Sequence, residues 1–190
     1  MKTILVGYPT SQKIKPGVEY LNSKYLPPEL EVTYLNYEGK TEKWSEYLAD
    51  YLSQLIDEVI VFSLDDYLIN APIDQRKWER ALELIKDKDV VCVKLCSNTE
   101  EEFVEYPITT QYCLWKREFL IEILKQTTTP WDFEMRGSIL FKQMKDKKVL
   151  LETCLSYYTN SSISSRWMGI DLKGLNDEDK KEFKKLCDIW

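Results

Sequence analysis

Two adjacent carboxylates, Asp65 and Asp66, follow directly after an unbroken run of β-branched and aromatic residues at 59–62. Such a run predicts a strand that is buried on both faces, in the middle of an α/β sheet. Open α/β folds bind their ligands where strands end at the carboxyl edge. Because neighbouring like charges repel, the pair indicates either a divalent cation or a hydroxyl-rich ligand. The alternative is that both residues only cap a turn.

A second acidic pair, Asp132 and Glu134, follows Pro130 and precedes a predicted helix that runs to about Met144. The positive end of the helix dipole stabilises a carboxylate there, so ordinary N-terminal capping is one interpretation. A catalytic base is the other. The chain contains no histidine, so any proton transfer must use Asp, Glu, Tyr, Lys or Cys.

Two polar stretches are further candidates for ligand contact. Pro9, Thr10 and Ser11 lie in a turn after a predicted first strand at 2–6, although the turn has no Gly-rich phosphate-binding pattern. The hydroxyl-rich segment 156–167 carries Arg166, a possible charge partner for a phosphate. A plain surface loop is the alternative for both stretches.

The elements that must position these residues alternate between strand and helix. Amphipathic periodicity predicts helices over 18–25, 41–55, 74–85 and 116–126, a helix that follows residues 131–134 and runs to about Met144, and a last helix after Asn176. Thr41, Asp74 and Asn176 are the predicted N-caps. Apolar runs predict strands over 2–6, 32–35, 58–63, 90–95, 109–114 and 149–155. This order predicts an α/β fold with a mostly parallel central sheet flanked by helices, in a single domain over residues 1–190.

Composition limits the class of protein. The chain has 190 residues, 44% of them hydrophobic, and no run approaches the length of a membrane span. Its five cysteines lie mostly in apolar segments, and no signal peptide is evident, which together favour a reducing, cytoplasmic location. A formal charge of −6 argues against a general nucleic-acid binder.

Three blocks in order resemble a family of small GT-A-fold glycosyltransferases that occur in bacterial surface-polysaccharide clusters and in large DNA viruses. They are Leu64-Asp65-Asp66-Tyr67-Leu68, the segment 111–120 (QYCLWKREFL), and Pro130-Trp131-Asp132-Phe133-Glu134. The resemblance covers roughly residues 59–138. A strict D-x-D motif would need an acid in place of Leu64 or Leu68, and this chain has none there.

The resemblance implies a Rossmann-like GT-A domain that transfers a sugar from a nucleotide-diphosphate donor, with UDP favoured, to a hydroxyl of a glycan or glycoconjugate. It implies that Asp66, and secondly Asp65, holds Mn²⁺ or Mg²⁺ at the diphosphate, with Asp65 also near the ribose or sugar. Glu134, or alternatively Asp132, would be the base of an inverting reaction. By position, Pro9, Thr10 and Ser11 would lie beside the base and ribose of the donor. Arg166, which comes from the hydroxyl-rich segment and not from the resemblance, is the predicted charge partner of the donor phosphate.

Two other functions fit the same sequence. A nucleotidyltransferase on a similar scaffold would need a Gly-rich, basic phosphate loop, and residues 7–15 are a poor version of one. A non-catalytic nucleotide-sugar-binding or assembly domain would keep the fold without the chemistry. Under each of these functions, the chain could be a whole protein or one domain of a longer one.

Overall fold

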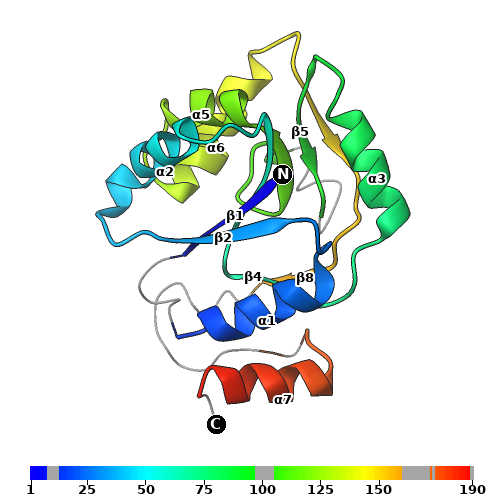
Figure 1. Cartoon of the computed structure of the whole chain (residues 1–190). Helices are drawn as coiled ribbons and strands as arrows, with labels where there is room; N and C mark the ends of the chain where they lie inside the picture. The colour runs from blue at the N-terminus through cyan, green and yellow to red at the C-terminus, as the bar shows by residue number, and fades with distance from the viewer. Residues whose placement is uncertain (8–12, 97–104, 160–171, 173, 189–190) are drawn as a thin grey trace.

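The computed structural model describes the chain except for residues 8–12, 97–104, 160–171, 173 and 189–190 (Figure 1). Strands and helices alternate along most of the chain, as the sequence predicts. The strands are β1 (Lys2–Gly7), β2 (Glu31–Asn36), β3 (Val59–Leu64), β4 (Tyr67–Ile69), β5 (Val90–Lys94), β6 (Cys113–Lys116), β7 (Lys148–Leu151) and β8 (Tyr157–Thr159). The helices are α1 (Lys15–Tyr25), α2 (Trp44–Ser53), α3 (Gln75–Leu84), α5 (Arg117–Leu124), α6 (Pro130–Lys142) and α7 (Asp177–Leu186), with a 3-10 turn, η2, at Thr41–Lys43.

The main sheet has six strands in the order β2-β1-β3-β6-β5-β7. Strands β2, β1 and β3 are parallel to one another, and so are β5 and β7. Strand β6 is antiparallel to both of its neighbours, β3 and β5. A mostly parallel sheet is therefore confirmed, and β3 lies inside it, as predicted. The reversed β6 starts at the edge where the parallel strands end.

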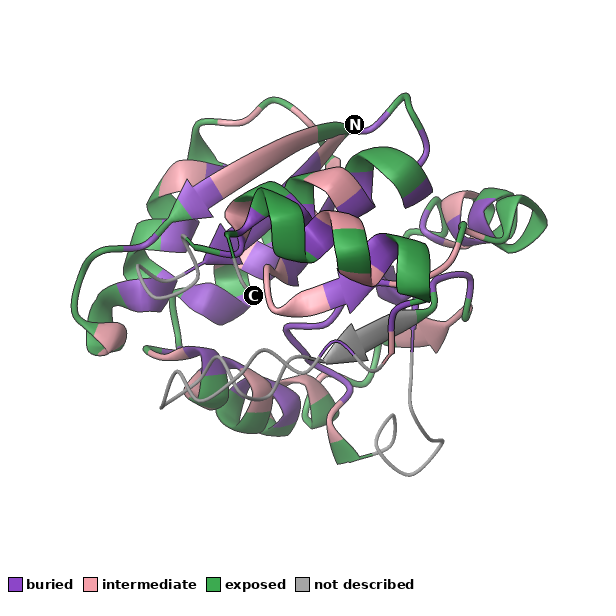
Figure 2. Cartoon of the chain, turned by 90° about the horizontal axis from the view of Figure 1, so that it is seen from below, coloured by how far each residue is buried: buried purple, intermediate pink, exposed green. Residues whose placement is uncertain are grey.

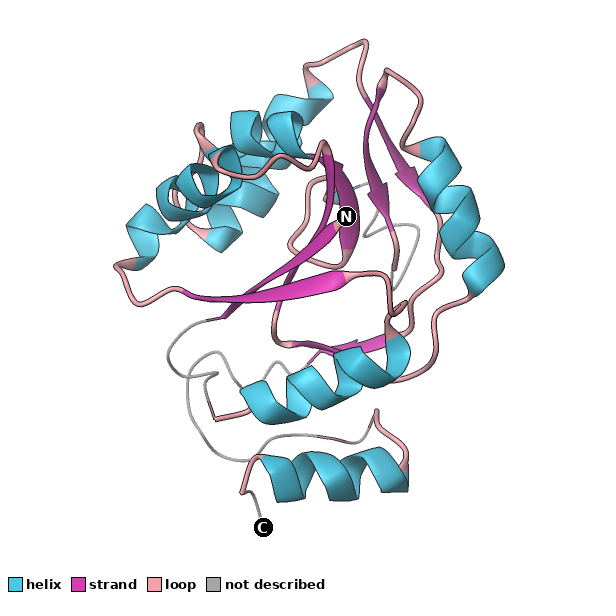
Figure 3. Ribbon diagram, in the orientation of Figure 1, coloured by secondary structure: helices cyan, strands magenta, loops and turns pink. Residues whose placement is uncertain are grey.

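Helices cover both faces of this sheet (Figure 3). Helices α2, α5 and α6 pack on one face, where Ile60 and Phe62 of β3 point. Helices α1, α3 and α7 belong to the core on the other face, which Val61 enters. This alternation of successive side chains follows from the pleat of the strand. Figure 2 shows buried and exposed segments alternating along the helices, as expected for helices that bury one side.

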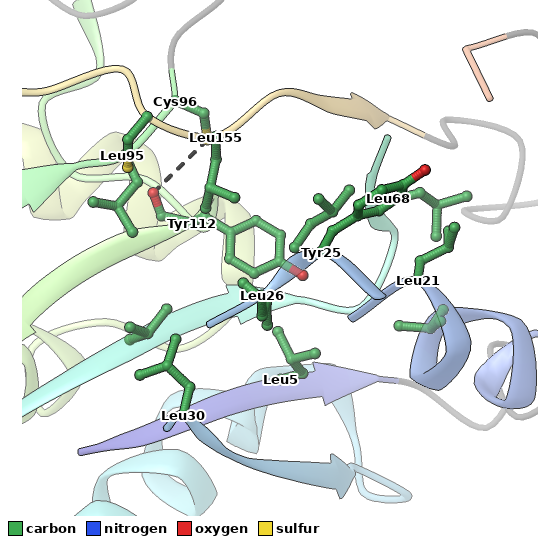
Figure 4. Close-up of a cluster of buried hydrophobic side chains, with 14 of the residues drawn as sticks. Leu5, Leu21, Tyr25, Leu26, Leu30, Leu68, Leu95, Cys96, Tyr112 and Leu155 are labelled. Atoms are coloured by element: carbon green, nitrogen blue, oxygen red, sulfur yellow. Dashed lines mark hydrogen bonds between the residues drawn. The ribbon is translucent and has the colours of Figure 1, made fainter. Parts of the chain in front are cut away.

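The core on the α1 face is drawn in Figure 4, where the Tyr112 side chain points toward Leu5 and Leu26. The Tyr112 hydroxyl donates a hydrogen bond to Asn22 Oδ1 at 3.1 Å, and Asn22 Nδ2 donates to the Tyr34 hydroxyl at 3.0 Å. These polar atoms are satisfied inside an otherwise apolar layer, which removes the cost of burying them.

Several local predictions are confirmed and others are corrected. Asp74 and Asn176 cap their helices, each accepting a hydrogen bond from a backbone N–H three residues on. Thr41 as an N-cap is wrong, because it begins the turn η2 and neither the turn nor α2 has a side-chain cap. All five cysteines are buried and free, in agreement with the sequence interpretation.

Two strands are shorter than predicted. Strand β6 begins only at Cys113, because the backbone N–H groups of Ile108 and Thr110 donate to the side chains of Ser138 and Glu134 on α6. Strand β7 ends at Leu151, after which the backbone N–H of Cys154 bonds to Leu95 beyond the end of β5.

Candidate active site

The acidic pair stands at the carboxyl end of β3, in the middle of the sheet. The backbone N–H of Asp65 donates to the Val6 carbonyl at 3.1 Å, and that of Leu64 donates to the Thr110 carbonyl at 3.0 Å. These bonds tie the pair to the end of β1 on one side and to the segment before β6 on the other. The location matches the sequence prediction of a ligand-binding edge.

Asp66 is held in an unfavourable environment for a charge. The residue is half-buried, but its Oδ1 atom is fully buried and accepts no hydrogen bond from any described residue. Burial, and then the negative charge of Glu134, raises the pKa of Asp66 from 3.8 to about 6. A cation or a protonated ligand group would compensate this carboxylate.

Glu134 reaches the same place from α6. Its Oε1 atom accepts hydrogen bonds from the Thr110 backbone N–H at 2.7 Å, the Thr110 hydroxyl at 2.8 Å and the Thr109 hydroxyl at 3.0 Å. Its Oε2 atom accepts none from the residues that the structure describes. The carboxylate is thus fixed through one oxygen, and the other oxygen is left for a ligand.

The neighbours of Glu134 on α6 explain why this helix is so firmly placed. The Phe133 ring packs against Trp44, Phe62 and Trp115, with ring centroids 6.1, 6.3 and 6.0 Å apart. The Ser138 hydroxyl bonds to both the backbone N–H and the carbonyl of Ile108, at 3.2 and 3.3 Å. The helix is therefore anchored in the core on both sides of the carboxylate.

Asp132 has a different role in the structure. Its Oδ2 atom accepts hydrogen bonds from the backbone N–H and the hydroxyl of Thr128, at 2.9 and 3.2 Å, while its own N–H donates to the Thr129 hydroxyl at 3.0 Å. This reciprocal arrangement is a helix N-terminal cap, one of the two roles that the sequence predicts for the acidic pair. Of the two acids, only Glu134 is brought against Asp66.

Asp65 acts on a different set of neighbours from Asp66. Burial, above all, raises the pKa of Tyr34 to about 12, and the Asp65 charge adds to that rise. The Asp65 charge also contributes to the raised pKa of Tyr112, for which burial is again the main cause. The Asp65 charge therefore affects Tyr34 of β2 and Tyr112 before β6, whereas the pKa of Asp66 is affected by Glu134 of α6.

The remaining predicted contacts lie outside the described residues. Pro9, Thr10, Ser11 and Arg166 all belong to ranges that the structure leaves out. Gly7, the last residue of β1, is described and pairs with Asn36 at the carboxyl end of β2.

The carboxylates at this edge suit a small divalent cation. Mg²⁺ and similar ions are commonly bound by one or two protein carboxylates, with substrate phosphates completing the coordination shell. The buried, unpartnered Oδ1 of Asp66 is a donor of that type. No cluster of three or more His, Cys, Asp or Glu residues that could hold a metal ion occurs among the described residues.

Three residues of the site were not singled out in the sequence. Thr109 and Thr110 orient Glu134, and the Tyr67 hydroxyl lies 3.5 Å from Thr110 Oγ1. Burial and then the Glu134 charge raise the pKa of Tyr67. In the sequence, Thr109 and Thr110 belong to the predicted strand 109–114, and Tyr67 only follows the acidic pair, so neither position indicates a role at a site.

A separate cleft of about 710 Å³ lies at the opposite end of β3. Val59, Lys116 and Phe119 are among the residues that line it, and none of the candidate site residues is. This cleft is therefore separate from the candidate site at the carboxyl edge of the sheet.

The sheet order and the position of the carboxylates define a Rossmann-like α/β protein with its candidate site at the carboxyl edge of the strands. No family model matches the chain, and no curated protein matches its sequence. None of the described helices combines the length and the apolar character that a membrane crossing requires.

Solved structures share the fold. A mannosyltransferase from Pyrobaculum calidifontis, in complex with GDP-Man and Mn²⁺, matches 80% of this chain with a TM-score of 0.52 and 15% identity. TarS from S. aureus matches 98% of it with a TM-score of 0.52 and 13% identity. The chain covers 54% and 38% of those two chains. It therefore has a GT-A, Rossmann-like fold, and at these identities the likeness establishes the fold alone.

Proposed function

We propose that this chain is a glycosyltransferase that moves a sugar from a nucleotide-diphosphate donor, with a UDP-sugar favoured, to a hydroxyl of a glycan or glycoconjugate. One observation carries the proposal: in a GT-A fold, the buried Asp66 carboxylate and the oriented Glu134 carboxylate meet at the carboxyl edge of the sheet. At this edge, Asp66 can help to bind a nucleotide-sugar donor, and Glu134 can accept a proton.

In this proposal Asp66 holds Mn²⁺ or Mg²⁺, and Asp65 contacts the ribose or the sugar of the donor. The metal ion would neutralise the charge on the departing nucleoside diphosphate. Glu134 accepts the proton of the acceptor hydroxyl through Oε2. The hydroxyl oxygen then bonds to the anomeric carbon as the bond to the diphosphate oxygen breaks, which inverts the configuration.

Donor binding tests the first half of the proposal. Thermal unfolding of the full chain with UDP, GDP, CDP and dTDP, each with and without Mn²⁺, should show stabilisation by one nucleotide only when the metal is present. The Asp66→Asn variant should lose this stabilisation. Asp50→Asn, an exposed acid on α2, is the matched control and should respond as wild type does.

Other outcomes would favour the two alternatives. Metal-dependent nucleotide binding without sugar transfer would indicate a non-catalytic binding domain. Release of pyrophosphate from a nucleoside triphosphate and a sugar phosphate would indicate a nucleotidyltransferase. If no nucleotide stabilises the chain, the donor site is assigned wrongly.

A further inference from the structure

The outer side of α6 carries a row of large apolar side chains that nothing in the described chain covers. Trp131, Met135 and Ile139 are 60%, 57% and 60% exposed. Their spacing of four residues places them in one row along the helix. The inner side, with Phe133 and Gly137, is buried against the core. Helix α6 therefore has apolar residues on both sides, whereas the outer side of a surface helix is usually polar.

Cations stand around this row, although the whole chain is acidic. Arg136 follows Met135 directly, Lys142 lies at the end of the same row, and Lys145 follows the helix; all three are exposed. Among the described residues, neither Arg136 nor Lys145 has an ion-pair partner. Lys142 donates only to the Glu105 backbone carbonyl, at 3.1 Å. These charges are therefore available to an anionic partner in a chain whose formal charge is −6.

The size and chemistry of this surface distinguish between partners. A stable protein interface uses roughly 20–30 residues on each side and is depleted in lysine. The α6 row is a single line of three apolar side chains with lysines at one end. An amphipathic helix that binds a lipid surface has this composition: Trp and aliphatic side chains enter the headgroup region while Lys and Arg remain at anionic phosphates.

We propose that the outer face of α6, defined by Trp131, Met135, Ile139, Arg136, Lys142 and Lys145, binds the surface of an anionic lipid bilayer. This binding to lipid does not require the chain to be an enzyme. A consequence that does rest on the proposed function is the position of the acceptor. Glu134 precedes Met135 on the same helix, so a membrane-held acceptor would reach the site from this side.

Vesicle flotation with the full chain tests this proposal without any donor or acceptor. We expect the protein to float with phosphatidylglycerol-containing vesicles and to remain in the soluble fraction with pure phosphatidylcholine. Raised salt should weaken the binding, because the attraction to headgroups is screened. The variant Trp131→Ser/Met135→Ser/Ile139→Ser should lose flotation. Ile56→Ser, which removes a 93% exposed apolar residue elsewhere, should float like wild type.

A second variant separates the charges from the apolar row. Arg136→Gln/Lys142→Gln/Lys145→Gln should weaken binding to anionic vesicles by about fivefold for each cation removed. All these positions are exposed, so thermal unfolding should show folded variants. The proposal is overturned if wild type does not bind anionic vesicles, or if the triple-serine variant binds as well as wild type. A dimer in sedimentation velocity that only the triple-serine change dissociates would assign the face to a second copy instead.

Discussion

The carboxylates of Asp66 and Glu134 come from separate parts of the chain and act on each other at the end of β3, where the charge of Glu134 adds to the burial that raises the pKa of Asp66. Glu134 is held by three donors through one oxygen, whereas the buried oxygen of Asp66 has no donor among the described residues. The two acids are therefore not equivalent. Hydrogen bonds orient the Glu134 carboxylate, whereas no donor among the described residues compensates the buried oxygen of Asp66.

This difference predicts a stability effect in the metal-free chain. The pKa of Asp66 is about 6 in the folded chain against 3.8 for the free group, so its ionisation at neutral pH costs the fold up to about 3 kcal/mol. Because the folded-state pKa is raised, wild type should lose this stability as the pH rises from about 4 to about 7. Asp66→Asn should be the more stable form at neutral pH and should lose that advantage near pH 4.

Urea unfolding in the presence of a metal chelator, repeated across that pH range, measures the difference. Asp50→Asn, which changes an exposed acid on α2, is the control. An Asp66→Asn variant that is less stable than wild type at neutral pH would show that the carboxylate is satisfied by a group outside the described residues.

Glu134→Gln should separate chemistry from structure. Glutamine keeps an oxygen that can accept the three hydrogen bonds from Thr109 and Thr110, so folding and nucleotide binding should change little. It cannot accept a proton, and loss of a general base typically costs about 10²-fold or more in turnover. Steady-state kinetics with the donor identified by the thermal screen measure this loss.

Asp132→Asn is the paired control for that experiment. Asp132 caps α6 through Thr128, and asparagine is an equally good capping residue, so turnover should stay close to wild type. If Glu134→Gln retains full turnover while Asp132→Asn loses it, the roles proposed for the two acids are reversed.

The sequence predicted the elements that depend on local pattern. The buried run of β3, the amphipathic helices and the caps at Asp74 and Asn176 are properties of short segments, and each is confirmed. Periodicity does not determine strand direction, so the reversal of β6 could not be read from it. That reversal places Thr109 and Thr110 at the carboxyl edge beside Glu134.

The sequence indicated which residues are candidates for the site, but not how they are arranged in space. The acid pair after β3 and the acids at the start of α6 were identified from residue type and position. Which of the two adjacent acids interacts with Glu134 depends on the backbone after β3, and in the structure the Glu134 charge contributes to the raised pKa of Asp66. The choice between Glu134 and Asp132 depends on the orientation of α6, which Phe133 sets by packing against the aromatic core.

Close packing between α1 and α7 predicts the effect of a small substitution. A Cβ atom added at Gly17 would lie 2.5 Å from the Phe183 ring, which is fully buried. Gly17→Ala should therefore destabilise the chain, despite the higher helix propensity of alanine, by about 1–3 kcal/mol. Glu19→Ala, at an exposed position of the same helix, serves as the control for propensity.

Urea unfolding of both variants and of the double variant Gly17→Ala/Phe183→Leu measures this clash. The smaller leucine side chain should recover part of the stability that Gly17→Ala loses in the wild-type background. Equal losses in both backgrounds would mean that the ring is not the obstacle.

The same helix pair is joined by a carboxylate with no exposed surface. Asp179 of α7 accepts hydrogen bonds from Lys24 Nζ at 2.7 Å, from the Tyr20 hydroxyl at 2.9 Å and from Asn176 Nδ2 at 2.7 Å, as well as from the Tyr25 hydroxyl. Burial alone would raise its pKa, but the hydrogen bonds from Lys24, Tyr25 and Tyr20 hold the pKa below its ordinary value of 3.8. The residues of α1 therefore bind the charged form of the Asp179 carboxylate.

Asp179→Ala should destabilise the chain by about 2–4 kcal/mol at neutral pH, because the donors of α1 lose a buried charged acceptor. Since the folded-state pKa is lowered, this contribution is complete above about pH 4 and is lost as the pH falls further. The deficit of the variant should therefore shrink in acid, which urea unfolding at neutral and acidic pH would detect. Asp177→Ala, a fully exposed acid in the same first turn, should leave stability unchanged. A deficit that stays constant with pH would mean that Asp179 acts through packing alone.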